Sequence, residues 1–173
     1  MSLEGDLLYL ANWTADLPNP GWPQLESGMA RTLPVPGALE LGNGWLLGGE
    51  ILEGAAASLA YPQALENEDP HQAWLDLQQL ELPLRVCAPR PGDRFQPLGL
   101  EGQTQKVADF FTNAHLPRRA RRLWPLVWSG ETLAWIVGFR PAHPLKLGPE
   151  VQRVLHLSLV READHFTSPA GAA

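Results

Sequence analysis

Apolar residues occur in short runs along the first half of the chain and predict strands joined by turns. Residues 7–10 form one such run, and residues 39–41 and 45–47 form two more on either side of Gly42-Asn43-Gly44. Asn-Gly accepts the positive φ angles of a tight turn, so these two runs predict a β-hairpin, with residues 50–52 extending its second strand.

The rest of the first half gives weaker signals. Residues 74–77 predict another short strand, whereas residues 62–70 are polar, begin and end with proline, and predict a solvent-exposed loop. Leu82-Pro83 marks the predicted junction with the second half.

The second half is patterned more clearly. Strands are predicted over residues 84–87, 126–128, 133–137 and 155–159, the last from Leu155, Leu157 and Leu159 alternating with polar residues. Residues 89–93 predict a turn. A helix is predicted from Thr104, its expected N-cap, with Val107, Phe110, Phe111 and Ala114 on one face. Pro117 opens a second short helix, which Pro125 must end.

This pattern predicts an α+β fold of two small domains, built from short, mostly antiparallel strands with a few short helices. Seventeen prolines and 16 glycines among 173 residues argue against long uninterrupted helices. The expected domains are an acidic β-rich domain over residues 1–83 and a basic α+β domain over residues 84–163, followed by a frayed tail over residues 164–173. The tryptophans at 124, 128 and 135 lie among aliphatic residues and are expected to pack in the core.

Charge divides the chain as the predicted domains do. Residues 1–84 contain 12 acidic residues and one basic residue, whereas residues 85–173 contain 12 basic and 7 acidic residues. The net charge of −6 therefore hides a basic segment, residues 85–146, with 10 bases and 4 acids.

Four arginines within five residues form the strongest local signal. Like charges this close repel one another unless anions neutralise them, and the arginine side chain is suited to bidentate contact with phosphate. The candidate phosphate-binding residues are Arg118, Arg119, Arg121, Arg122, Lys106, Arg90 and Arg94. A solvated surface, or ion pairs with Glu66, Glu68 or Asp69 of the acidic half, would explain the same residues, and composition leaves both interpretations open. Arg94 and Asp93 are also candidates for bracing their own turn.

No catalytic or metal-binding motif is found. The five histidines are scattered, and no apolar run approaches the roughly 20 residues of a membrane helix. Cys87 is the only cysteine, lies in an apolar strand, and is expected to be buried and inert. The first residues are acidic where a secretory signal carries bases, so we expect a cytoplasmic protein.

A longer string of residues carries a family resemblance. It runs from Leu84 through Pro91-Gly92-Asp93-Arg94-Phe95, Asp109-Phe110-Phe111, Pro117, Arg121 and Trp124-Pro125 to Trp135-Ile136-Val137-Gly138. This string resembles the C-terminal region of tRNA(Ile)-lysidine synthetase, and residues 31–83 resemble the segment just upstream more weakly. The chain departs from the family pattern at Cys87, where an arginine is common, and before Phe110, where Lys106 alone remains of a basic helix.

The resemblance implies a function for the basic segment. The family is an ATP-dependent ligase that attaches lysine to the wobble cytidine of an isoleucine tRNA. Its ATP and Mg²⁺ bind an N-terminal domain with a Ser-Gly-Gly-x-Asp-Ser loop, which this sequence lacks, so we expect this chain alone to be non-catalytic and to bind no cofactor. The implied role is tRNA binding, around the acceptor stem. The implied partners are tRNA, the catalytic domain in the same or another polypeptide, and a second copy of the chain. A non-catalytic module that docks onto a catalytic partner is the alternative.

Overall fold

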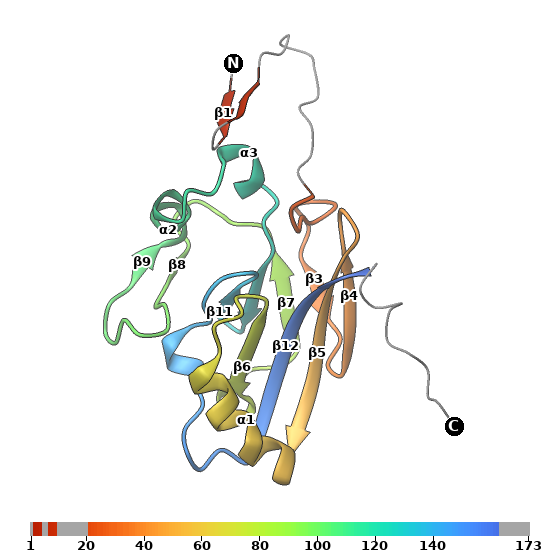
Figure 1. Ribbon diagram of the computed structural model, residues 1–173, viewed down its shortest axis with the longest axis vertical. Coiled ribbons are helices and arrows are strands. Elements are labelled where there is room, and N and C mark those ends of the chain that lie inside the picture. Colours follow the sequence, from red (N-terminus) through yellow and green to blue (C-terminus); the bar gives the residue numbers. More distant parts are fainter. Residues whose placement is uncertain (1, 5–6, 10–20, 163–173) are drawn as a thin grey trace.

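Two four-stranded antiparallel sheets pack face to face at the centre of the molecule (Figure 1). The computed structural model describes residues 2–4, 7–9 and 21–162, and the side chains of residues 21–162. The predicted tail, residues 164–173, lies outside the described residues.

The first sheet has the strand order β11-β10-β7-β3. Its strands are β3 (Arg31–Leu33), β7 (Leu84–Cys87), β10 (Leu126–Ser129) and β11 (Thr132–Ile136). The strands predicted at 84–87, 126–128 and 133–137 are therefore confirmed.

The second sheet has the order β4-β5-β12-β6. Its strands are β4 (Gly37–Leu41), β5 (Trp45–Glu53), β6 (Gln72–Asp76) and β12 (Arg153–Arg161). The predicted hairpin is confirmed, because β4 pairs with β5 and the turn residues Asn43 and Gly44 have φ angles of 64° and 71°.

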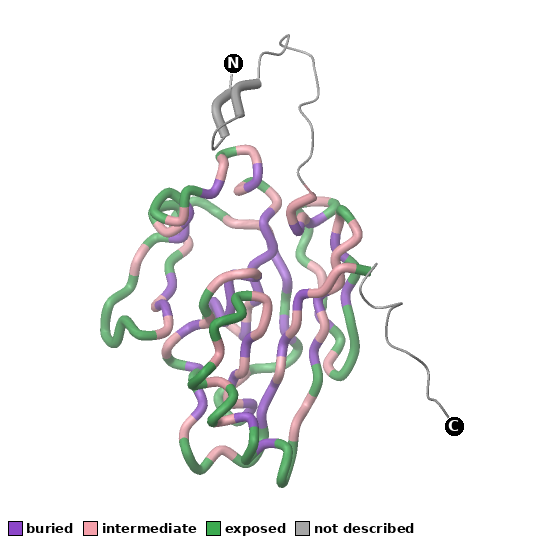
Figure 2. Tube along the Cα trace, in the orientation of Figure 1, coloured by how far each residue is buried: buried purple, intermediate pink, exposed green. Residues whose placement is uncertain are grey.

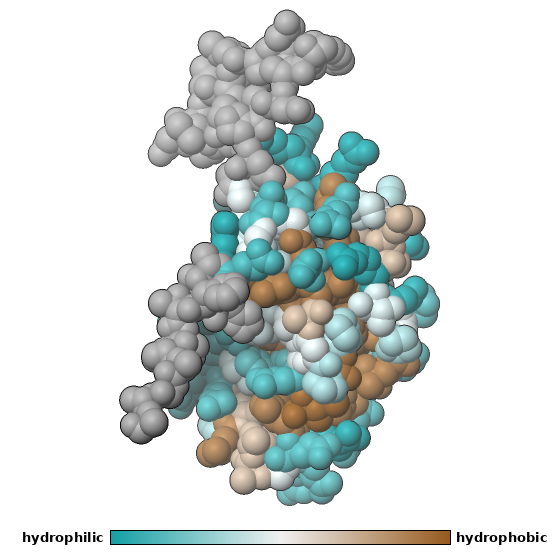
Figure 3. Space-filling view, turned by 90° about the vertical axis from the view of Figure 1, so that its right-hand side faces the viewer, coloured by the Kyte–Doolittle hydropathy of each residue, from teal (hydrophilic) through white to brown (hydrophobic). Residues whose placement is uncertain are grey.

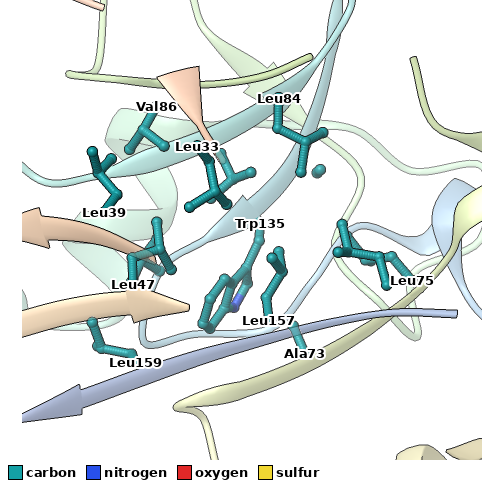
Figure 4. Close-up of a cluster of buried hydrophobic side chains, with 14 of the residues drawn as sticks. Leu33, Leu39, Leu47, Ala73, Leu75, Leu84, Val86, Trp135, Leu157 and Leu159 are labelled. Atoms are coloured by element: carbon teal, nitrogen blue, oxygen red, sulfur yellow. The ribbon is translucent and has the colours of Figure 1, made fainter. Parts of the chain in front are cut away.

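Leucine, valine and tryptophan side chains fill the space between the two sheets (Figure 4). Leu33, Leu84 and Val86 of the first sheet face residues of the second, including Leu47 and Leu157, and Trp135 lies between them. The Trp135 side chain is fully buried, and its indole N–H donates to the Phe139 carbonyl oxygen at 2.6 Å. Figure 2 shows buried positions along the central strands, whereas residues 99–104, between β8 and β9, are exposed.

Helix α1 (Ala55–Glu66) packs at one end of the second sheet (Figure 1). It buries the small side chains Ala57 and Ala60 and contains Pro62. The loop predicted at 62–70 is therefore wrong up to Glu66. Figure 3 shows the adjoining side of the molecule, that of β4 and β5, where apolar side chains gather in patches bordered by polar ones.

The remaining elements form a smaller layer over the outer face of the first sheet. They are β8 (Arg94–Phe95), β9 (Gln105–Lys106), α2 (Val107–Asn113) and α3 (Arg118–Arg121). A second apolar cluster holds them there: Phe95, Val107 and Phe111 pack with Leu126, Leu133 and Ile136 of β10 and β11.

One predicted helix boundary is wrong and another is confirmed. Lys106, not Thr104, is the N-cap of α2, because residues 105 and 106 continue strand β9 and the Val107 N–H donates to the Asp93 carbonyl oxygen at 2.9 Å. Helix α3 begins after Pro117 and ends at Arg121, before Pro125, as predicted.

Short elements complete the description: 3-10 turns at Leu77–Gln79 and His143–Leu145, and an antiparallel pair, β1 (Ser2–Glu4) with β2 (Leu7–Tyr9). The longest described helix has 12 residues, as the proline and glycine content indicated.

The sheets combine strands from both sides of Leu82-Pro83. Strand β3 of the acidic half pairs with β7, and β12 of the basic half lies between β5 and β6. One apolar cluster extends from Leu25 to Leu159. The predicted boundary therefore does not separate two independent cores, although the predicted α+β class with mostly antiparallel strands is confirmed.

Candidate nucleic-acid interface

Helix α3 is a single turn that is held by hydrogen bonds from an earlier segment of the chain. Its only buried residue, Ala120, is 1% exposed, and its small side chain lets another segment approach closely. Gln24 donates from Nε2 to the Ala120 carbonyl oxygen at 3.0 Å, and the Leu25 N–H donates to the Leu123 carbonyl oxygen at 2.8 Å. The arginine-rich turn is thus fixed in place by residues almost 100 positions earlier in the chain.

Arg118 and Arg122 extend into solvent. They are four residues apart, so they lie on the same side of the turn, and both are exposed. Neither side chain has a hydrogen-bond or ion-pair partner within residues 21–162. Two adjacent guanidinium groups without a neutralising carboxylate form a surface suited to phosphate.

Arg121 has a different environment from its neighbours. Its Nε donates to the Leu116 carbonyl oxygen at 2.7 Å, Nη1 to Thr112 Oγ1 at 2.9 Å and Nη2 to the Phe111 carbonyl oxygen at 3.4 Å. These bonds join α3 to the C-terminal end of α2, where carbonyl groups lack helical partners. The geometry therefore gives Arg121 a structural task.

Arg119 lies over an aromatic ring. Its Cζ is 5.1 Å from the centroid of the Trp22 ring, a cation–π contact, and its side chain is partly buried. No role could be predicted for Trp22, because this contact joins residues far apart in the chain.

Lys106 and Arg94 are cross-strand neighbours. They are paired in the β8–β9 ladder and both are exposed. Arg94 Nη2 donates to both the carbonyl and the hydroxyl oxygen of Thr104 at 3.3 Å. Arg94 therefore braces the β8–β9 ribbon and not, as had been predicted, its own turn. Directly opposed like charges destabilise a strand pair, and an anion between them relieves the repulsion.

Arg90 begins the turn that precedes β8. Its N–H donates to Asp93 Oδ2 at 2.7 Å, and the Asp93 N–H donates to the Arg90 carbonyl oxygen at 3.2 Å. Asp93 thus braces the turn, as predicted. Both of these hydrogen bonds use the backbone of Arg90, and its side chain is exposed.

The candidate residues follow one side of the molecule. In Figure 1, β8, β9, α2 and α3 succeed one another along its left-hand edge, and α3 lies at the end opposite α1. Ion pairs between described residues join Arg85 to Glu131 and Arg153 to Glu53, and a hydrogen bond joins His156 to Glu50. None of them connects α3 to Glu66, Glu68 or Asp69, the acidic residues that were its predicted alternative partners.

Within residues 21–162, no cluster of histidine, cysteine and carboxylate side chains is arranged to hold a metal ion. His71 packs edge-on against Trp45, and His156 stacks on Trp74 between Glu50 and Gln72. Cys87 is buried as predicted, and this burial raises the pKa of its thiol. No described helix is long and apolar enough to cross a membrane.

Residues 84–156 match the family model of the TilS substrate C-terminal domain. The curated relatives include the tRNA(Ile)-lysidine synthases of Caldanaerobacter subterraneus (31% identical, covering 56% of this chain and 20% of the relative) and Symbiobacterium thermophilum (39%, covering 50% and 19%). That of Geobacillus kaustophilus is 34% identical over 66% of this chain and 23% of its own. The chain thus spans about a fifth of the length of these relatives.

The fold also matches solved structures. A crystal structure of a TilS C-terminal domain superposes with a TM-score of 0.65 at 28% identity, covering 78% of this chain and 98% of the other. An N-terminal fragment of the phenylalanyl-tRNA synthetase β-subunit from Pyrococcus horikoshii shares the fold alone, with a TM-score of 0.51 at 14% identity, over 67% of this chain and 39% of that one. The resemblance seen in the sequence is confirmed.

Proposed function

We propose that this chain, which carries a TilS substrate C-terminal domain in residues 84–156, is the tRNA-binding region of a tRNA(Ile)-lysidine synthase. The observation that supports this most strongly is the exposed pair Arg118 and Arg122, which no described carboxylate neutralises. Lys106 and Arg94 add a second exposed cationic pair beyond α2.

The geometry of α3 suits a structured RNA backbone. Arg121 fixes the helix to α2 and Arg119 packs over Trp22, so the two outer guanidinium groups are presented from a rigid base. Because a rigid cationic surface loses little conformational entropy on binding, it favours phosphates held at fixed spacing in a helical stem. We assign that stem to the acceptor arm of the tRNA.

The remaining parts of the proposal concern the full-length enzyme. There, ATP and Mg²⁺ bind the N-terminal catalytic domain, which attaches lysine to the wobble cytidine, and this chain supplies binding without chemistry. The catalytic domain, in the same or another polypeptide, and a second copy of the chain are the protein partners in this proposal. Action on tRNA also favours a cytoplasmic location.

The proposal is tested by binding to an isoleucine tRNA transcript. The variant R118Q/R122Q removes two exposed charges with no described structural partner, and should weaken binding at least tenfold at low salt. The control is R153Q/K146Q, which also removes two exposed charges, both from residues that are not among the candidate phosphate-binding residues. Arg153 pairs with Glu53 where β5 and β12 meet near α1. Equal affinities of the two variants for tRNA would refute the proposal.

A further inference from the structure

A hollow of about 170 Å³ opens on the outer face of the first sheet. Its walls include Arg85 of β7, Arg90 of the following turn and Trp128 of β10, with Cys87 among them. The carboxylates of Asp93 and Glu131 also line it, and Asp93 Oδ2 already accepts the backbone N–H of Arg90 at 2.7 Å. Arg85 and Trp128 are paired in the ladder between β7 and β10, so their positions are set by the sheet itself.

The two arginines converge on this hollow. Burial raises the pKa of the Cys87 thiol, the charges of Arg85 and Arg90 act to lower it, and the charge of Asp93 raises it further, so that the pKa is raised on balance. Burial excludes water on the Cys87 side, which strengthens the field of the two guanidinium groups at the mouth of the hollow.

Both side chains can accept an anion. The Arg90 side chain has no hydrogen-bond or ion-pair partner within residues 21–162. Arg85 donates from Nη2 to the Gly130 carbonyl oxygen at 2.7 Å, and its contact with Glu131 is a long one of 3.8 Å to a fully exposed carboxylate. An ion pair of this kind contributes little and yields readily to a phosphate.

We propose that this hollow, formed by Arg85, Arg90 and Trp128, is a second phosphate-binding site for the same RNA. The inference rests on the proposed function and extends it, because it adds Arg85 and Trp128 to the interface. The two guanidinium groups contact a backbone phosphate, and the indole of Trp128 offers a flat apolar wall to the adjoining ribose or base. Arg90 links this site to the surface that carries Arg94 and Lys106.

The test uses Cys87 as a local reporter, since it is the only cysteine of the chain. The rate of its reaction with a small thiol reagent is measured with and without the isoleucine tRNA transcript. A phosphate held by Arg85 and Arg90 neutralises the charges that lower the thiol pKa, and each unit of pKa rise slows the reaction roughly tenfold. Inorganic phosphate at the same ionic strength serves as the free-anion control.

The variants R85Q/R90Q and R90Q distinguish the contribution of this site to tRNA binding from that of α3. We expect tRNA to protect Cys87 in the wild type but not in R85Q/R90Q, and the salt slope of binding to fall by about two in that variant. The single variant R90Q controls for an effect on folding, because the Arg90 side chain has no described partner. It should change the salt slope of tRNA binding by about half as much as R85Q/R90Q does.

Two results would overturn the inference. The first is that R85Q/R90Q binds tRNA with unchanged affinity and with unchanged protection of Cys87, while R118Q/R122Q binds tRNA weakly. This result would leave the proposed function intact. The other is protection by inorganic phosphate equal to that by tRNA, which makes the hollow a site for free anions. If neither double variant weakens binding, the proposed function fails as well.

Discussion

Arg121 donates from Nε to the carbonyl oxygen of Leu116 at 2.7 Å, and this bond ties the arginine-rich turn to the end of the preceding helix. One arginine of the cluster thus positions the others. Arg118 and Arg122, on the solvent side, have no such contacts within the described residues.

Replacing Arg121 by alanine should therefore destabilise the protein more than replacing one of the exposed arginines does. Three hydrogen bonds are lost, and the Leu116 and Phe111 carbonyl oxygens lose a partner, so we expect a loss of about 2 kcal/mol in the free energy of unfolding. The change is measured by urea denaturation. Arg118→Ala is the control and should change the same quantity by less than about 0.5 kcal/mol. Similar losses in the two variants would show that Arg121 has no special structural task.

Lys106→Gln should have opposite effects on stability and binding. It removes one of two like charges that face each other across the β8–β9 ladder, so the free energy of unfolding should rise by about 0.3 kcal/mol. The affinity for tRNA should fall at the same time. Thermal unfolding and a filter-binding assay measure the two effects. A variant that loses both stability and affinity would contradict this role of Lys106.

Cys87 predicts a dependence of stability on alkaline pH. Burial raises the pKa of its thiol above the ordinary value of 9.0, so the folded state retains a proton that the unfolded state releases. Stability from this group is complete below pH 9 and is lost as the pH rises through the pKa of the folded state. The free energy of unfolding of the wild type, relative to Cys87→Ala, should therefore fall as the pH rises above 9.0 towards the raised pKa of the folded state. A difference that stays constant over this range would show that the thiol titrates normally.

The strands were predictable because their signal is local. Leucines at 155, 157 and 159 alternate with polar residues, and the Asn43-Gly44 pair requires a turn, so neither prediction needed information from elsewhere in the chain. Helix α1 was missed because it packs through Ala57 and Ala60, whose small side chains give almost no amphipathic signal, and because Pro62 interrupts the pattern. The pairing between the two halves of the chain was not predictable because it is non-local: β12 pairs with β5 and β6, which are strands of the acidic half.

The candidate interface was predictable as a set of residues but not as a set of roles. Composition identified the four arginines of the cluster, yet their division into exposed and structural side chains depends on distant partners. Trp22 is the partner of Arg119, and the end of α2 is the partner of Arg121. Arg85 lay outside the predicted set because its surroundings come from strands that are joined only in the fold.

The most direct test of the central claim is the salt dependence of tRNA binding. The logarithm of the binding constant is plotted against the logarithm of the salt concentration for the wild type, R118Q/R122Q and R153Q/K146Q. If Arg118 and Arg122 each neutralise a phosphate, the slope for R118Q/R122Q should be shallower than that of the wild type by about two, and the control should match the wild type. Equal slopes for all three proteins would contradict the claim that α3 binds the RNA backbone.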